Sequence, residues 1–156
     1  MKRLISILLT LGISALLNAQ SFEEINGKIY DADGCLLTGR YLTQYDNGKV
    51  KEEIHFVNGI KEGAYINYCE AGNMIEMGVY HENIKHGKWT RWDKLGFKVG
   101  EVRYDHGRKD GKWQIWDMRG VLRYVMYYEN DRRAGLWKIY NEKGGIVDEQ
   151  NYDISI

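Results

Sequence analysis

The chain has 156 residues, enough for one ordinary domain, and its 22 basic and 22 acidic residues give a formal charge of zero. This balance argues against partners that need a basic surface, such as nucleic acid or an anionic membrane. Proline is absent, whereas the chain has 18 glycines and 13% aromatic residues. This composition indicates that glycines form the turns and aromatic side chains form much of the core, as in all-β proteins.

Residues 1–19 have the pattern of a secretory signal peptide. A basic pair precedes an apolar run of about 14 residues, Leu4 to Leu17, and the small residue Ala19 precedes a polar segment. A membrane anchor is the weaker alternative, because a spanning helix needs roughly 20 apolar residues. We predict cleavage near Ala19, which leaves 20 basic and 22 acidic residues. The mature chain is expected to be secreted or periplasmic and not membrane-spanning.

Residues 20–38 are predicted to form a partial repeat that caps the N-terminal end of a repeat array. The stretch GKIYDADGCLLTG carries Tyr30 four residues before Gly34, the spacing that Trp116 and Gly120 show later in the chain. It then reaches Gly39 in only five residues, so this unit is truncated.

A period of 24 residues fills positions 39–156, with repeats starting at 39, 63, 87, 111 and 135. An opening glycine begins each unit, at Gly39, Gly63, Gly87, Gly111 and Gly135. An inner glycine follows nine residues later, at Gly48, Gly72, Gly96, Gly120 and Gly144. Two residues after the opening glycine stand Tyr41, Tyr65, Trp89, Trp113 and Trp137. Seventeen residues after it stand Phe56, Tyr80, Tyr104, Tyr128 and Tyr152. A fixed period of this length is the signature of a repeat array.

Each unit is predicted to be one β-hairpin. Alternate positions of its second half are mostly apolar, as at Leu122, Tyr124, Met126 and Tyr128, which indicates a strand with one buried face. The inner glycine ends a short turn where positive φ suits glycine, and a polar outer connection such as residues 58–63 reverses the chain again. We expect a first strand of about six residues and a second of about nine. The predicted fold is all-β, an elongated antiparallel meander sheet of hairpins that stabilise one another.

The rings two residues after the opening glycine, Trp89, Trp113 and Trp137 among them, are interpreted as core. The column five residues after that glycine has the opposite parity and is predicted to face outward. It comprises Gln44, Tyr68, Trp92, Trp116 and Tyr140. A row of exposed rings offers a surface for a peptide or a glycan, so Tyr68, Trp92, Trp116 and Tyr140 are the candidate partner-binding residues. The alternative is that they pack beneath the turns.

Little in the sequence indicates catalysis. A catalytic site must be unique, whereas structure recurs in every unit, and no nucleophile elbow, phosphate loop or dinucleotide fingerprint occurs. His81, Glu82, His86 and His106 could converge through neighbouring outer turns on a metal such as zinc, but without ligand-type spacing they are interpreted as solvated turn residues. We therefore predict no metal, no cofactor and no enzyme. Cys35 and Cys69 are either one disulfide or two free thiols.

The pattern G-x-W-x-x-(Y/W)-x-x-x-G, followed by an aromatic residue and an NG or HG turn, resembles the MORN-repeat variant. It is most similar to the tandem arrays of bacterial proteins catalogued as YwqK-family antitoxins, and the resemblance covers residues 27–156. It implies a hairpin array, an interaction scaffold as in related MORN arrays, and, for the YwqK family, neutralisation of a partner toxin. The chain departs from the pattern at Gln44, which replaces a ring, and at Asn83 and Asp131, which replace an outer-turn glycine.

The predicted function is that of an exported, non-enzymatic scaffold that binds another protein through an aromatic sheet face. One alternative is recognition of an envelope polysaccharide by the same rings. Another is an antitoxin or immunity role, as the resemblance implies. An exposed edge strand would make self-association plausible.

Overall fold

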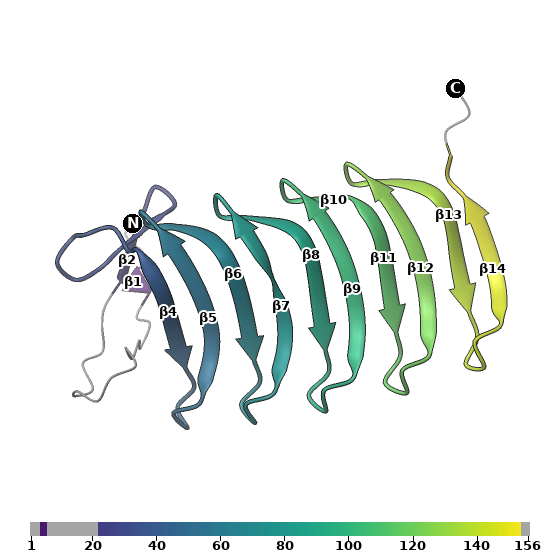
Figure 1. Ribbon diagram of the computed structural model, residues 1–156, viewed down its shortest axis with the longest axis horizontal. Helices are drawn as coiled ribbons and strands as arrows, with labels where there is room; N and C mark the ends of the chain where they lie inside the picture. The colour runs from purple at the N-terminus through teal and green to yellow at the C-terminus, as the bar shows by residue number, and fades with distance from the viewer. Residues whose placement is uncertain (1–3, 6–21, 154–156) are drawn as a thin grey trace.

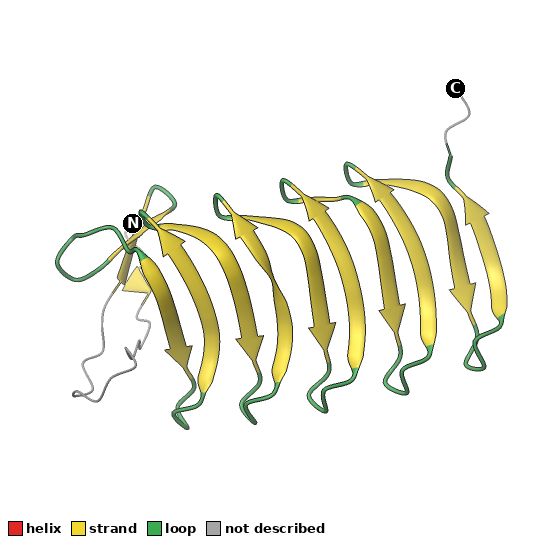
Figure 2. Ribbon diagram, viewed as in Figure 1, coloured by secondary structure: helices red, strands yellow, loops and turns green. Residues whose placement is uncertain are grey.

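The computed structural model describes residues 4–5 and 22–153, so the predicted cleavage site lies outside the described residues. The predicted all-β meander is confirmed: every described element is a strand (Figure 2). A sheet of 11 strands has the order β14-β13-β12-β11-β9-β8-β7-β6-β5-β4, with β10 beside β9, and a second sheet has the order β1-β2-β3. The described part of the chain contains no helix with the length and apolarity to cross a membrane.

The strands are β1 (Leu4–Ile5), β2 (Phe22–Ile25), β3 (Lys28–Tyr30), β4 (Gly39–Gln44), β5 (Val50–Val57), β6 (Ile60–Tyr68), β7 (Met74–His81), β8 (Ile84–Trp92), β9 (Lys98–Asp105), β10 (Arg108–Lys109), β11 (Gly111–Trp116), β12 (Leu122–Glu129), β13 (Arg132–Tyr140) and β14 (Ile146–Asn151). Consecutive strands lie side by side along the molecule (Figure 1). The turns that follow β4, β6, β8, β11 and β13 form one long edge, which we call the inner-turn edge, and the remaining turns form the outer-turn edge.

The outer connections differ from the prediction. The chain reverses within two residues of positive φ, as at Asn58 (50°) and Gly59 (76°), a pair that matches the right-handed twist of hairpin strands. Strand β6 therefore begins at Ile60 and has nine residues instead of six, whereas β5 has eight instead of nine. Gly63, expected in the turn, lies inside β6 with a φ of 91°, where the pairing of β5 with β6 shifts register. The opening glycine thus bends a strand (Figure 1).

Asn83 and Asp131 show why an outer-turn glycine can be replaced. Both residues adopt a φ of 67°, which asparagine and aspartate tolerate better than most residues. Asn83 Oδ1 accepts the Lys61 N–H at 2.7 Å, and Asp131 Oδ1 accepts the Lys109 N–H at 2.8 Å. Each of these two departures from the repeat therefore adds a hydrogen bond between neighbouring units.

The core follows one face of the large sheet and is closed at its N-terminal end by the small sheet. Phe22 and Leu37 are buried against Phe56, and the rings of Phe22 and Tyr41 meet edge to face at 6.1 Å. A hollow of about 430 Å³ remains between the two sheets. At the other end β14 is the last strand of the sheet, and all six of its residues are exposed.

Candidate functional site

A continuous ladder of rings covers the face of the large sheet that holds the core. From Tyr65 to Tyr152 the rings alternate between the two columns that lie two and seventeen residues after the opening glycine. Consecutive ring centres are 4.9 to 6.4 Å apart, within the range of favourable aromatic contacts. Trp89 has no exposed surface, whereas Trp113 and Trp137 are partly exposed. We call this set of rings the ring ladder and its side of the sheet the ladder face.

A column of cations covers the ring ladder, and the repeat pattern of rings and glycines did not predict it. Lys85 Nζ lies 3.7 Å from the centre of the Trp89 ring, Lys109 Nζ lies 5.0 Å from that of Trp113, and Arg133 Cζ lies 4.9 Å from that of Trp137. Each cation stands two residues before an opening glycine, so the 24-residue period could have revealed it. The bend at that glycine places the cation over the rings, where cation–π attraction stabilises the stack.

Hydrogen bonds fix the indoles of the ring ladder to the sheet. Nε1 of Trp89, Trp113 and Trp137 donates to the carbonyl ten residues earlier, at 3.2, 3.0 and 2.8 Å respectively. Gly78 lies directly beneath Trp89, because a Cβ there would stand only 2.2 Å from the ring. The ring ladder is therefore a packed core.

Four tyrosines of the ring ladder, Tyr65, Tyr80, Tyr104 and Tyr128, have raised pKa values. Burial, reinforced by the nearby Glu52 carboxylate that accepts the Tyr65 hydroxyl at 3.0 Å, raises the pKa of Tyr65 strongly. Burial is also the main cause that raises the pKa values of Tyr80, Tyr104 and Tyr128. A phenol whose pKa is raised is a weaker acid than an ordinary tyrosine and stays protonated near neutral pH.

The four candidate binding rings end their strands beside the inner turns. Each stands three positions after a ring-ladder residue, so strand alternation directs it to the opposite face of the sheet. Tyr68, Trp92, Trp116 and Tyr140 are all partly exposed. The structure places all four at the ends of their strands along one edge of the sheet.

Trp116 lies next to a lysine side chain and next to a hollow in the sheet surface. Lys98 Nζ stands 4.1 Å from the centre of its ring and bonds to Glu101 at 3.3 Å, so one face of this indole is already covered. β9 and β11 share only two residue pairs. A hollow of about 400 Å³ next to this short strand pairing is bordered by both Trp113 and Trp116.

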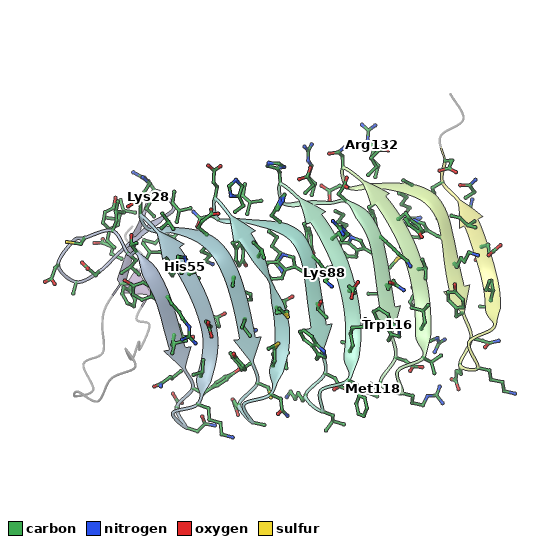
Figure 3. All side chains as sticks on the ribbon, in the orientation of Figure 1. Lys28, His55, Lys88, Trp116, Met118 and Arg132 are labelled. Atoms are coloured by element: carbon green, nitrogen blue, oxygen red, sulfur yellow. The ribbon has the colours of Figure 1, made fainter. Side chains whose placement is uncertain are left out.

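The turns beside Trp92 and Trp116 carry exposed apolar side chains that the sequence pattern did not single out. Leu95 is 80% exposed, Met118 is 78% exposed and Phe97 is 52% exposed. The two turns are neighbours because β9 pairs with β11, and Figure 3 shows Met118 in the turn next to Trp116. We call Trp92, Leu95, Phe97, Trp116 and Met118 the apolar edge. Clustered exposed apolar groups commonly mark an interaction site.

Aspartate side chains hold these turns in a fixed shape. Asp93 Oδ1 accepts the N–H groups of Leu95 and Phe97, both at 2.9 Å. Asp117 Oδ1 accepts those of Arg119 and Val121 at 2.9 and 3.0 Å. These hydrogen bonds hold the apolar side chains at the tips of the turns in fixed positions.

Cys69 occupies the position of Asp93 and Asp117 in the second unit. It is buried, whereas Cys35 is exposed, and both are free thiols. Burial raises the pKa of the Cys69 thiol, but hydrogen bonds from the backbone N–H groups of Asn73, Ala71 and Gly72 outweigh it and bring this pKa below its ordinary value. The sulfur replaces the carboxylate as the acceptor in the turn.

Three of the four histidines meet at the outer-turn edge. The ring centres of His81 and His86 are 6.1 Å apart, and those of His86 and His106 are 5.5 Å apart. Glu82 is not part of the group of possible metal ligands formed by His86, Asp105 and His106, and its backbone N–H donates to the Glu62 carboxylate at 3.0 Å. His81 and His106 are exposed, as expected for turn residues, but sequence spacing alone did not establish that they converge.

Together the repeated hairpins, the ring ladder and the exposed inner turns define a β-hairpin repeat protein with one packed face. Residues 37–58 match the family model described as the MORN repeat variant. The matched segment spans β4, its inner turn and β5, so it is one hairpin of the array. A comparison with curated proteins gave no match.

Proposed function

We propose that the chain is an exported, non-enzymatic module that binds another protein through the apolar edge. The observation that carries this proposal is the exposure of Leu95, Phe97 and Met118 on two adjacent turns that flank Trp92 and Trp116. Burying apolar surface stabilises a complex by roughly 25 cal/mol per Å² before entropic costs are subtracted. Large apolar side chains held on rigid turns supply the kind of anchor that protein interfaces use.

A protein partner fits these side chains better than a polysaccharide does. A sugar stacks on an open ring face, and Lys98 already covers one face of Trp116. The most exposed members of the apolar edge, Leu95 and Met118, are not aromatic. An antitoxin or immunity role is the particular case in which the partner is a toxin.

The test is capture of partners from an envelope fraction on the immobilised chain. Leu95→Ser/Met118→Ser changes two side chains that contribute little to folding because they are exposed. We expect this variant to lose the captured protein. The matched control is Val57→Ser/Ile84→Ser, which removes two exposed apolar residues, 39% and 41% exposed, next to the outer turns.

Three outcomes count against the proposal. Equal capture by the wild type and the Leu95/Met118 variant would remove the apolar edge as the binding surface. Retention on purified wall polysaccharide without any captured protein would favour glycan recognition instead. Recovery of the chain from cytoplasmic extract with residues 1–19 intact would contradict export, whereas a mature chain that begins at Gln20 is expected.

A further inference from the structure

We propose that His86, Asp105 and His106 form a binding site for a divalent transition-metal ion such as Zn²⁺. One ligand atom from each residue lies within 4.8 Å of the others. His86 Nδ1 is 3.6 Å from Asp105 Oδ1, which is 2.8 Å from His106 Nδ1. Zinc binds imidazole nitrogen and carboxylate oxygen at about 2.0–2.2 Å, so neighbouring ligands of a tetrahedral ion lie about 3.4 Å apart. Small side-chain rotations bring all three atoms to that spacing.

His86 stands in a column whose residue has a structural task in the first, second and fourth units. In those units the residue before the opening glycine accepts a backbone N–H from the next outer turn: Thr38 from Asn58 at 3.0 Å, Glu62 from Glu82 at 3.0 Å and Asp110 from Asn130 at 3.3 Å. At His86 the corresponding nitrogen, Nδ1, is buried and has no hydrogen-bond partner among the described residues. Leaving a buried polar atom unpaired costs about 1–3 kcal/mol, and coordination to a metal satisfies that nitrogen.

The ligands are held in place by the backbone on which they stand. His86 lies in β8, and the turn that carries His106 is fixed to the same strand by the Gly107 N–H, which donates to the Lys85 carbonyl at 2.9 Å. His106 itself adopts a φ of 45° in that turn. Two backbone elements tied together one residue from His86 therefore present the ligand set, which favours a defined coordination geometry.

The surroundings favour a cation over an anion. The Asp105 carboxylate belongs to the cluster, and a second carboxylate, that of Glu62, contacts His81, whose ring centre is 6.1 Å from that of His86. Glu62 Oε1 is 3.1 Å from His81 Nδ1, which leaves His81 Nε2 as the nitrogen for further contacts. The three-residue set has room for an outside ligand as the fourth, because tetrahedral zinc takes four.

The experiment titrates Zn²⁺ into the purified full chain, produced without a polyhistidine tag, by calorimetry, and repeats the titration with Co²⁺, whose visible absorption reports tetrahedral coordination. We expect one equivalent bound by the wild type. His86→Thr installs the residue that Thr38 provides in the first unit, so it is expected to fold. Its affinity for Zn²⁺ is expected to fall at least tenfold, as is that of His106→Ala.

His55→Ala is the matched control, because His55 bonds to the Glu62 carbonyl at 3.0 Å and lies outside the three-residue set. It is expected to bind Zn²⁺ with unchanged affinity. The proposal is overturned if the wild type binds no stoichiometric Zn²⁺, if His86→Thr binds it as tightly as the wild type, or if His55→Ala loses as much affinity as His86→Thr. The apolar edge lies at the other end of the strands, so these results do not depend on the proposed function.

Discussion

Trp89 and Trp116 come from neighbouring units of one repeat, yet they stand in different surroundings. Trp89 is enclosed by Tyr65, Tyr80 and Tyr104 and has no exposed surface. Trp116 is partly exposed at the end of β11, next to turns whose tips are apolar. Their positions within the unit, and not the indole itself, decide which one is core. An aromatic repeat therefore carries core packing on the ladder face and partly exposed rings at the inner-turn edge.

The largest effect is expected from removing the enclosed ring. Trp89→Ala should lower the free energy of unfolding by about 3–5 kcal/mol, because it leaves a cavity among the buried rings. Trp116→Ala should cost less than about half as much, since its side chain is already partly hydrated. Urea unfolding followed by circular dichroism measures both values, and an equal loss would erase the distinction between the two positions.

A second prediction concerns the glycine beneath Trp89. Gly78→Ala should destabilise the fold by about 1–3 kcal/mol, because the new methyl group must displace the Trp89 ring. Gly100→Ala is the matched control on the same face, since its Cβ would stand 3.7 Å from the nearest side-chain atom. Thermal unfolding should separate the two variants. An unchanged thermal unfolding of Gly78→Ala would show that the Trp89 ring does not pack tightly on this glycine.

The inner turns can be strengthened without touching the ring ladder. Cys69→Asp gives the second unit the carboxylate that Asp93 and Asp117 provide in the third and fourth. We expect a gain of about 0.5–1.5 kcal/mol, because a charged acceptor replaces sulfur in the bonds to backbone N–H groups. Urea unfolding checks the sign, and a loss of stability would mean that burial of the carboxylate outweighs its hydrogen bonds.

The smallest predicted effect depends on pH. Burial tends to raise the pKa of Asp117, but N–H groups of Val121 and Arg119, together with the Arg119 charge, lower it below its ordinary value. A depressed carboxyl pKa stabilises the fold above the pKa of the unfolded chain, and this contribution is lost as pH falls through the folded pKa. The stability difference between wild type and Asp117→Asn should therefore vanish in acid. A difference that persists there would contradict this assignment.

The sequence was sufficient to predict the hairpin array. Two glycine columns and the alternation of apolar residues, as from Leu122 to Tyr128, define hairpins without any tertiary information. The predicted length of six residues for the first strand holds for β4 and β11, whereas β6 has nine. Gly63 marks a bend inside β6, and a glycine at positive φ serves a bend or a turn equally well.

Features that arise between units were harder to predict. The meeting of His86 with His106 depends on outer turns that stack on the preceding unit, as the bond from Gly107 to Lys85 shows. The apolar edge depends on the exposure of Leu95 and Met118, two turn residues that the repeat pattern of rings and glycines does not single out. Each feature occurs in particular units only. The repeat pattern records what all units share, so it does not reveal either feature.

The most direct test of the central claim is site-specific photo-crosslinking in an envelope fraction, with the reactive group placed at Met118 or at Arg132. Figure 3 shows these residues at opposite ends of the strands, and both are exposed. We predict a discrete crosslinked protein from position 118 and none from position 132. A product from position 132 alone, or equal products from both, would contradict the assignment of binding to the apolar edge.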